Sequence, residues 1–348
     1  MRRKIKVLII DDSALAREIL RKGLSRYEDL EVVGTAADVY EGRDKIVYLK
    51  PDVLTLDIEM PKMDGVEFLR RLIPQYPIPV IVVSSLSSDN AGVTLDALDF
   101  GAVDYIQKPS SRFGNKLAGM MDELHEKLIY ASSVNVKRIR ENYNFKVKES
   151  TSVLRGATDK IILIGASTGG TVAIKKVVEE FPPDMPGCVI VQHMPEGFTK
   201  MFAEKLNQLC RVEVKEAETG DRIIRGRVLV APGNKQLYVN RSGSDYVVLC
   251  KSEERINGHC PSVEPLFDSA ARYCGSNTVA VMLTGMGADG ADAMVRLRET
   301  GARTMAQDRE TSVVFGMPGE AYARGGAEVL VPIEKITSTI LSFLGDMK

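Results

Sequence analysis

The chain has 348 residues, of which 44% are hydrophobic and 27% charged. This composition is ordinary for a folded globular protein, and the length predicts two domains rather than one. The formal net charge of -1 excludes the strong positive field expected of a protein that binds nucleic acid or an anionic membrane surface. No apolar run approaches the roughly 18 residues that a membrane span needs, so we expect a cytoplasmic protein.

The numbers and spacings of cysteine and histidine limit the kinds of site that we expect in this chain. The five cysteines are an odd number and form no CxxC pair, which indicates a reducing compartment and no disulfide framework. The three histidines, His125, His193 and His259, have no zinc-site spacing. Only His193 and His259 lie in the C-terminal half, so a histidine-dependent reaction there has two candidates.

Residues 1–125 contain short runs rich in β-branched residues, typical of strands, which alternate with stretches typical of helices. This pattern predicts a five-stranded parallel sheet with helices on both faces. The expected strands are 6–10, 32–33, 53–56, 80–83 and 105–106, and the clearest expected helices are 14–25 and 65–72.

A polar stretch separates this domain from a second one. We predict a linker over 126–158 and a second α/β domain over 159–348, doubly wound around a mostly parallel sheet. Its expected strands are 161–164, 188–191, 228–230, 246–249, 279–283 and 329–331, and its expected helices are 172–180, 199–209, 265–273 and 291–300.

Acidic residues follow two strands of the first domain. Asp11 and Asp12 come after one strand and Asp57 after another. Because the carboxyl ends of parallel strands share one sheet edge, these carboxylates should converge, and a hard cation such as Mg²⁺ would offset their repulsion. Ser84 and Lys108 reach the same edge. The simpler alternative is that Asp11 and Asp12 only cap a helix.

These residues resemble a response-regulator receiver domain over about 4–125. The matching positions are Asp11-Asp12, Asp57-Ile-Glu-Met-Pro61, Asp64-Gly65, Ser84, Tyr105 and Lys108-Pro109. The resemblance implies a flavodoxin-like fold in which Asp57 accepts a phosphoryl group from a histidine kinase. It further implies that Asp11, Asp12, Asp57 and the Glu59 carbonyl hold Mg²⁺, that Lys108 pairs with the phosphoryl group, and that Ser84 and Tyr105 form the switch.

A glycine-rich loop, 165–170, opens the second domain. It could bind a phosphate on helix N-terminal amides, or it could be a nucleophile elbow, since Gly165-Ala-Ser-Thr-Gly169 fits G-x-S-x-G. The Walker and dinucleotide patterns are absent. The elbow pattern alone is weak evidence, because small residues suit any tight turn between a strand and a helix.

A serine nucleophile needs a base and an orienting acid. His193 ends its own strand and should share the sheet edge with Ser167. Asp289 follows strand 279–283 and a glycine-rich turn, with Asp292 as the alternative; the simpler reading of Asp289 is a turn or helix cap. Backbone amides at Met286 and after Ser167 could form an oxyanion hole. The chain order Ser, His, Asp excludes the usual α/β-hydrolase.

Residues 160–345 resemble the catalytic domain of the chemotaxis methylesterase family, CheB. The motifs are Ile164-Gly-Ala-Ser-Thr-Gly-Gly170, Gln192-His-Met-Pro195, Gly197-Phe-Thr199, Ala231-Pro-Gly233, Pro261-Ser-Val263, Leu283-Thr-Gly-Met-Gly287, Asp289-Gly290 and Val314-Phe-Gly-Met-Pro318. Two positions depart from the pattern: the family often has His at Gln236 and Arg at Cys260, which affects details of the substrate groove.

The resemblance implies a protein-glutamate methylesterase that also deamidates glutamines. Its substrates would be methyl-accepting chemoreceptors, its phosphoryl donor a chemotaxis histidine kinase, and its membrane contact only peripheral, through those receptors. The implied triad is Ser167, His193 and Asp289, with the Met286 amide in the oxyanion hole and no cofactor for ester hydrolysis. We further hypothesise that the unphosphorylated receiver covers the active-site groove.

Three alternatives remain at this point. A DNA-binding regulator would need a short basic output domain, which this neutral α/β half does not resemble. A binding module with an inert triad can be excluded only by an assay. A cysteine hydrolase built on Cys260 and His259 is disfavoured, because adjacent side chains of an extended segment point to opposite faces.

Overall fold

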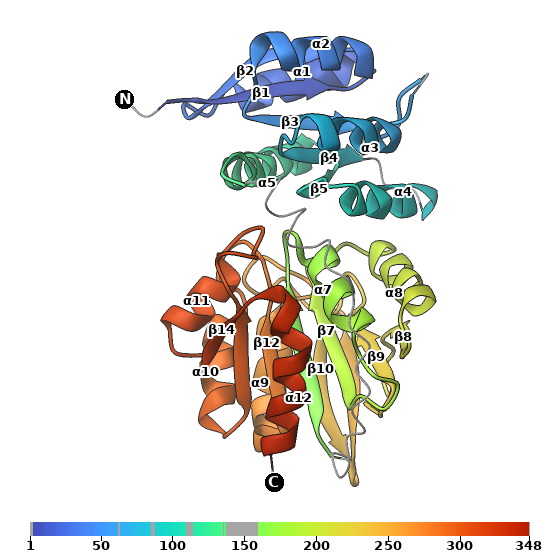
Figure 1. Cartoon of the computed structure of the whole chain (residues 1–348), viewed down its shortest axis with the longest axis vertical. Helices are drawn as coiled ribbons and strands as arrows, with labels where there is room; N and C mark the ends of the chain where they lie inside the picture. The colour runs from blue at the N-terminus through green and yellow to red at the C-terminus, as the bar shows by residue number, and fades with distance from the viewer. Residues whose placement is uncertain are drawn as a thin grey trace. The chain divides into compact units, whose positions relative to one another are not determined.

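The computed structural model describes residues 3–61, 63–84, 88–108, 114–134, 136 and 159–347, without the side chains of 88–90 and 114–116. The chain separates into two compact units, Met1–Arg140 and Glu141–Lys348 (Figure 1).

The first unit is built on a parallel sheet. Within its described residues the strands are β1 (Ile5–Ile10), β2 (Leu30–Ala36), β3 (Val53–Asp57), β4 (Val80–Ser84) and β5 (Asp104–Gln107). They pair in parallel in the order β2-β1-β3-β4-β5, which is the flavodoxin-like order. Strands β3 and β4 are buried along their whole length, as expected when helices cover both faces. The fold predicted from the sequence is confirmed for this unit.

Helices follow each strand of this sheet. They are α1 (Ala14–Leu24), α2 (Val39–Leu49), α3 (Gly65–Gln75), α4 (Ser88–Asp99) and α5 (Gly114–Ser132). The side chains of Ser13, Asp38 and Asp64 cap α1, α2 and α3 by accepting backbone amides.

Helix α5 extends into the segment 126–158 that we expected to be a linker. The reason is tertiary: Leu128 is fully buried, and the Lys127 ammonium group lies 2.7 Å from Asp104 Oδ2 at the start of β5. The rest of the expected linker lies outside the described residues, apart from a few positions.

The second unit contains a larger parallel sheet and a separate hairpin. Within the described residues the sheet order is β14-β13-β12-β6-β7-β9-β8, with every pair parallel. The strands are β6 (Ile161–Ala166), β7 (Gly187–Gln192), β8 (Glu213–Glu216), β9 (Arg227–Val230), β12 (Thr278–Met282), β13 (Arg303–Gln307) and β14 (Val329–Val331). The hairpin pairs β10 (Gln236–Ser242) with β11 (Asp245–Lys251) in antiparallel register.

Helices lie on both faces of this sheet, as Figure 1 shows. They are α7 (Gly170–Glu179), α8 (Phe198–Leu209), α9 (Val263–Tyr273), α10 (Ala291–Glu299), α11 (Met317–Ala323) and α12 (Ile336–Asp346). Alternate residues of β6, such as Ile161 and Leu163, join one buried cluster with α9, α10 and the hairpin. On the other face α12 meets α7, where the Thr337 hydroxyl donates to the Val177 carbonyl at 3.0 Å.

The turn between β6 and α7 depends on Gly169. Its φ is +76°, and a Cβ atom at this position would lie 2.5 Å from Val313 Cγ2. Gly243, in the turn between β10 and β11, has a similar φ of +62° but nothing within 4 Å of a Cβ atom. A side chain at Gly243 would therefore cause backbone strain alone, whereas one at Gly169 would cause both strain and steric overlap.

We expect Gly243→Ala to lower the free energy of unfolding by about 1 kcal/mol, the usual cost of a left-handed residue with a Cβ atom. Gly169→Ala should cost clearly more, because Val313 must also move. Urea denaturation of both full-length variants measures the difference. Equal losses would show that the overlap at Gly169 is relieved without cost.

Candidate active site

Ser167 lies at the carboxyl edge of the second sheet, immediately after β6. Its amide donates to the Thr284 carbonyl at 3.0 Å, and its own carbonyl accepts the Gly170 amide at 2.7 Å. These bonds hold the turn against the segment that follows β12. The residue is half-buried at this edge.

His193 follows the neighbouring strand, β7, and faces Ser167. Its amide donates to the Ala166 carbonyl at 3.1 Å, which extends the β6–β7 pairing by one step. The ring places Nδ1 3.2 Å from Ser167 Oγ and Nε2 2.8 Å from Asp289 Oδ2. The side chain is 8% exposed. The structure thus brings together the three residues that the sequence singled out.

The tautomer of His193 follows from these contacts. An ionised carboxylate only accepts hydrogen bonds, so Nε2 carries the hydrogen and Nδ1 is left to accept the Ser167 hydroxyl. In the serine-protease triad the two nitrogens are used the other way round. The chemical requirement is the same, because the nitrogen that faces the serine is the unprotonated one.

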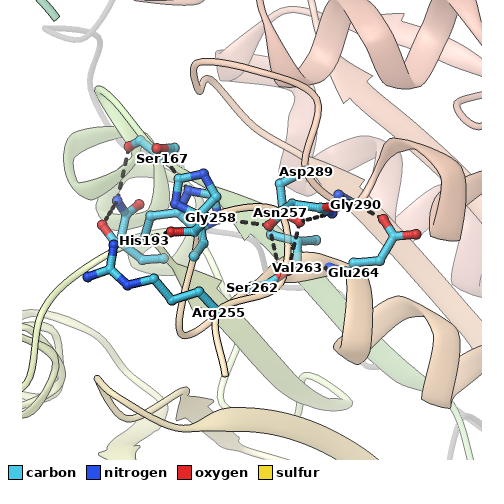
Figure 2. A network of polar contacts seen from close by, with 12 residues as sticks. Ser167, His193, Arg255, Asn257, Gly258, Ser262, Val263, Glu264, Asp289 and Gly290 are labelled. Carbon is cyan, nitrogen blue, oxygen red and sulfur yellow. Dashed lines mark hydrogen bonds and ion pairs between the residues drawn. The ribbon is translucent and has the colours of Figure 1, made fainter. Parts of the chain in front are cut away.

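Asp289 is a buried carboxylate surrounded by donors (Figure 2). Oδ1 accepts the Asn257 side-chain amide at 2.8 Å and the Ser262 hydroxyl at 2.7 Å. Oδ2 accepts His193 Nε2 and the Val263 amide at 2.7 Å. Burial acts to raise the pKa of Asp289, but the hydrogen bonds from His193, Asn257 and Ser262 outweigh it and hold this pKa at about 2.

The start of α9 contributes to this environment. Ser262 caps the helix by accepting the Glu264 amide at 3.2 Å, and it donates its own hydrogen to Asp289. The positive end of the helix dipole therefore faces the carboxylate. Asp292, the alternative acid, lies in the first turn of α10 and pairs with Arg324 at 2.8 Å on the surface, not with His193.

Gln192 joins the two loops that carry Ser167 and His193. Its Nε2 donates to the Ser167 carbonyl at 3.0 Å and to the His193 carbonyl at 3.2 Å. The side chain is buried, at 4% exposure for the residue. The Gln192-His-Met-Pro195 motif did not indicate a role for Gln192, because the contacts of its side chain cross between two strands.

The peptide between Gly285 and Met286 has a defined direction. The Gly285 carbonyl accepts the Gly316 amide at 3.1 Å and the Met317 amide at 2.8 Å. Because the carbonyl and N–H of a trans peptide point in opposite directions, the Met286 N–H is turned away from α11. This orientation leaves the Met286 amide available to the side opposite α11.

Cys260 does not face His259 as a nucleophile would. Its Sγ lies 3.9 Å from the Glu253 carbonyl, and burial raises the pKa of the thiol. The His259 ring instead stacks on His193. The arrangement disfavours a cysteine–histidine pair at these two positions.

The first unit holds a second polar cluster at the carboxyl edge of its sheet. Side-chain oxygens of Asp11, Asp12 and Asp57 lie within 4.8 Å of one another. Lys108 Nζ is 2.6 Å from Asp57 Oδ2 and 2.9 Å from Asp11 Oδ2. Burial raises the pKa of Asp57, and the bond from Lys108 only partly opposes this effect. Three oxygen ligands at this spacing fit a hard divalent cation such as Mg²⁺.

The remaining predicted receiver residues lie on or within two residues of β3, β4 and β5. The Glu59 amide donates to Asp57 Oδ1 at 3.1 Å. Ser84 is buried at the end of β4 and accepts the Thr94 hydroxyl at 3.1 Å. The Tyr105 ring is buried in β5, and the Lys127 ammonium lies 5.9 Å from its centroid. Burial raises the pKa of Tyr105 well above its usual value.

Among the helices of the described residues, none combines the length and apolar character needed to cross a membrane.

Comparisons with known proteins give both halves a family. Residues 162–340 match the family model for CheB methylesterase, and residues 7–115 match that for the response regulator receiver domain. A protein-glutamate methylesterase/protein-glutamine glutaminase of Syntrophotalea carbinolica is 54% identical over 352 residues, covering 100% of both chains. One of the same name from Sulfurimonas denitrificans is 48% identical over 350 residues, covering 99% of each.

A solved structure resembles the second unit. The Thermotoga maritima CheB methylesterase catalytic domain is 36% identical, with a TM-score of 0.52, and the match covers 53% of this chain and 98% of that one. The family matches, the full-length relatives and this structural likeness agree with the geometry at Ser167. The chain belongs to the CheB methylesterase family and carries a response regulator receiver domain ahead of its catalytic domain.

Proposed function

We propose that this chain is a protein-glutamate methylesterase that also deamidates protein glutamines, acting on chemoreceptors in chemotaxis adaptation. The observation that carries the proposal is the unbroken hydrogen-bond chain from Ser167 Oγ through both nitrogens of His193 to Asp289. The names of the full-length relatives support the substrate class.

The proposed reaction begins at the Ser167 hydroxyl. Oγ attacks the side-chain carbonyl of a glutamate methyl ester while its proton passes to Nδ1 of His193. The imidazolium returns this proton to the methoxide, methanol leaves, and an acyl-serine remains. Water then attacks the acyl group with the same proton transfer and releases glutamate and free Ser167. With a glutamine side chain, ammonia takes the place of methanol.

Two groups stabilise the charges that develop. Asp289 is ionised at neutral pH and accepts Nε2–H, so it favours the imidazolium and holds the reactive tautomer. The Met286 amide, which its peptide bond directs away from α11, is the proposed oxyanion donor. A donor of this kind typically contributes about 2.7–4 kcal/mol of transition-state stabilisation.

The receiver unit is proposed to control this activity. Asp57 would accept a phosphoryl group from a chemotaxis histidine kinase, with Lys108 paired to the new phosphate. Mg²⁺, held by Asp11, Asp12, Asp57 and the Glu59 carbonyl, would supply charge neutralisation there. Ser84 and Tyr105 would respond as the switch. The protein would work in the cytoplasm and meet the membrane only through its receptors.

Ser167→Ala should abolish methanol release from methylated receptor membranes, because the variant has no hydroxyl to form the acyl intermediate. Wild type should release methanol and should also be inactivated by a serine-directed fluorophosphonate. If wild-type protein binds the receptors but releases no methanol, the chain is a binding module and not an esterase.

Asp289→Asn should lower kcat by about 10⁴-fold, as loss of the orienting acid does in serine triads, because a carboxamide no longer secures the Nε2–H tautomer. Asp292→Asn, the same change on the surface of α10, is the matched control and should leave kcat unchanged. Methanol release measures both. If Asp292→Asn lost kcat and Asp289→Asn did not, the orienting role would belong to Asp292.

The stability difference between wild type and Asp289→Asn should depend on pH. The pKa of Asp289 is depressed to about 2, so its ionised form stabilises the fold fully above the ordinary aspartate pKa of about 3.9. This stabilisation is lost as the pH falls through about 2. The advantage of wild type over Asp289→Asn in the free energy of unfolding should therefore shrink in acid.

Asp57→Asn should form no base-labile acyl phosphate when it is treated with a small phosphoryl donor and Mg²⁺. The donor should also no longer stimulate methanol release by this variant. Asp52 precedes the same strand at its opposite end, where it pairs with Arg3 at 2.9 Å. Asp52→Asn is therefore the matched control and should be phosphorylated normally. Phosphate uptake by Asp57→Asn equal to wild type would contradict the assignment.

A further inference from the structure

A short loop between β11 and α9, residues 256–262, lies against the proposed triad; we call it the strap. The Ile256 amide donates to the His259 carbonyl at 3.0 Å, and the His259 amide donates to the Ile256 carbonyl at 2.9 Å. Between them Asn257 and Gly258 have φ values of 53° and 83°. This is the tight hairpin turn that an Asn-Gly pair favours. It directs the Asn257 side chain to Asp289, as Figure 2 shows.

The strap is held by Gln236, which is fully buried at the start of β10. Its Nε2 donates to the His259 carbonyl at 2.9 Å and to the Glu254 carbonyl at 3.1 Å. Its Oε1 accepts the Ser262 amide at 2.8 Å. A single carboxamide therefore anchors the strap backbone on both sides of His259, and the His259 ring projects from a rigid support.

The His259 ring lies flat on the His193 ring. The two centroids are 3.7 Å apart and the planes differ by 14°. The hydrogen bonds of His193 run from its ring edge to Ser167 and Asp289. Both bonds lie at the ring edge, so they restrain the ring faces only indirectly. A flat group packed on one face limits tilting of the ring out of its plane and keeps water from that face.

We propose that His259 is a positioning residue for the base: its ring holds the His193 imidazole in the plane where Nδ1 meets the Ser167 hydroxyl. This inference rests on the proposed function only in taking Ser167 as nucleophile and His193 as base. Small misplacements of a reacting group reduce rates strongly, by about 10²-fold for an error of about 1 Å. The flat shape of the ring, and not its ring nitrogens, carries this role.

Three variants of the full chain test the proposal. His259→Phe keeps a flat ring, and His259→Leu has a branched side chain without one. His125→Leu is the matched control, since His125 is also stacked, on Tyr27 with centroids 3.9 Å apart, but lies in the other unit. The readouts are the rate of Ser167 labelling by a small fluorophosphonate, which needs the base but no receptor, and KM and kcat for methanol release.

We expect His259→Leu to slow labelling and to lower kcat by about tenfold to hundredfold, with KM unchanged. His259→Phe should stay within about threefold of wild type, and His125→Leu should match it. The final extent of labelling counts the folded sites, so each rate is normalised to it, and partial unfolding cannot pass for a slower base.

The proposal would be refuted if His259→Leu were labelled at the wild-type rate. It would also be refuted if His259→Phe were labelled as slowly as His259→Leu, because the ring nitrogens would then matter. Rapid labelling of Ser167 without methanol release would instead contradict the proposed substrate and leave the role of His259 measurable. No labelling of wild type at Ser167 would overturn both.

Discussion

The buried charge of Asp289 is the interaction on which the second unit depends. A carboxylate with 2% side-chain exposure is costly unless donors surround it. Its described donors come from the end of β7, the strap and the start of α9, where His193, Asn257, Ser262 and Val263 lie. These segments must all be in place before the charge is satisfied. The stability of this edge and the tautomer of His193 therefore have a common origin.

In both units the polar cluster lies at the carboxyl edge of the parallel sheet. In each, side chains that end parallel strands meet where the chain turns into a helix. At Asp57 burial prevails over the bond from Lys108 and the pKa is raised. At Asp289 hydrogen bonds prevail over burial and the pKa is lowered. Burial therefore dominates the environment of the first carboxylate, and hydrogen bonds dominate that of the second.

Sequence periodicity located the elements that are apolar and regular, and it missed others for physical reasons. Strand β8 alternates charged residues with a single buried Val214, so it has no apolar run to recognise. Helix α5 continues past the expected boundary because Leu128 and Lys127 find partners in the sheet. The strap was missed although its Asn257-Gly258 pair is a turn signal, because the signal says nothing about what the turn touches.

The order of residues along the chain was enough to predict most strands of the two parallel sheets, the edge to which Ser167, His193 and Asp289 belong, and the acidic cluster of the first unit, because strand ends in a parallel sheet converge whatever the details of packing. It did not predict β13, and the expected strand 246–249 lies in the antiparallel hairpin and not in the sheet. Only the tertiary structure decided which nitrogen of His193 faces the serine, that Gln192 and Gln236 hold the loops, and that the His259 ring covers the His193 ring. Those contacts join segments far apart in the chain, and their geometry depends on side-chain directions that no local pattern encodes.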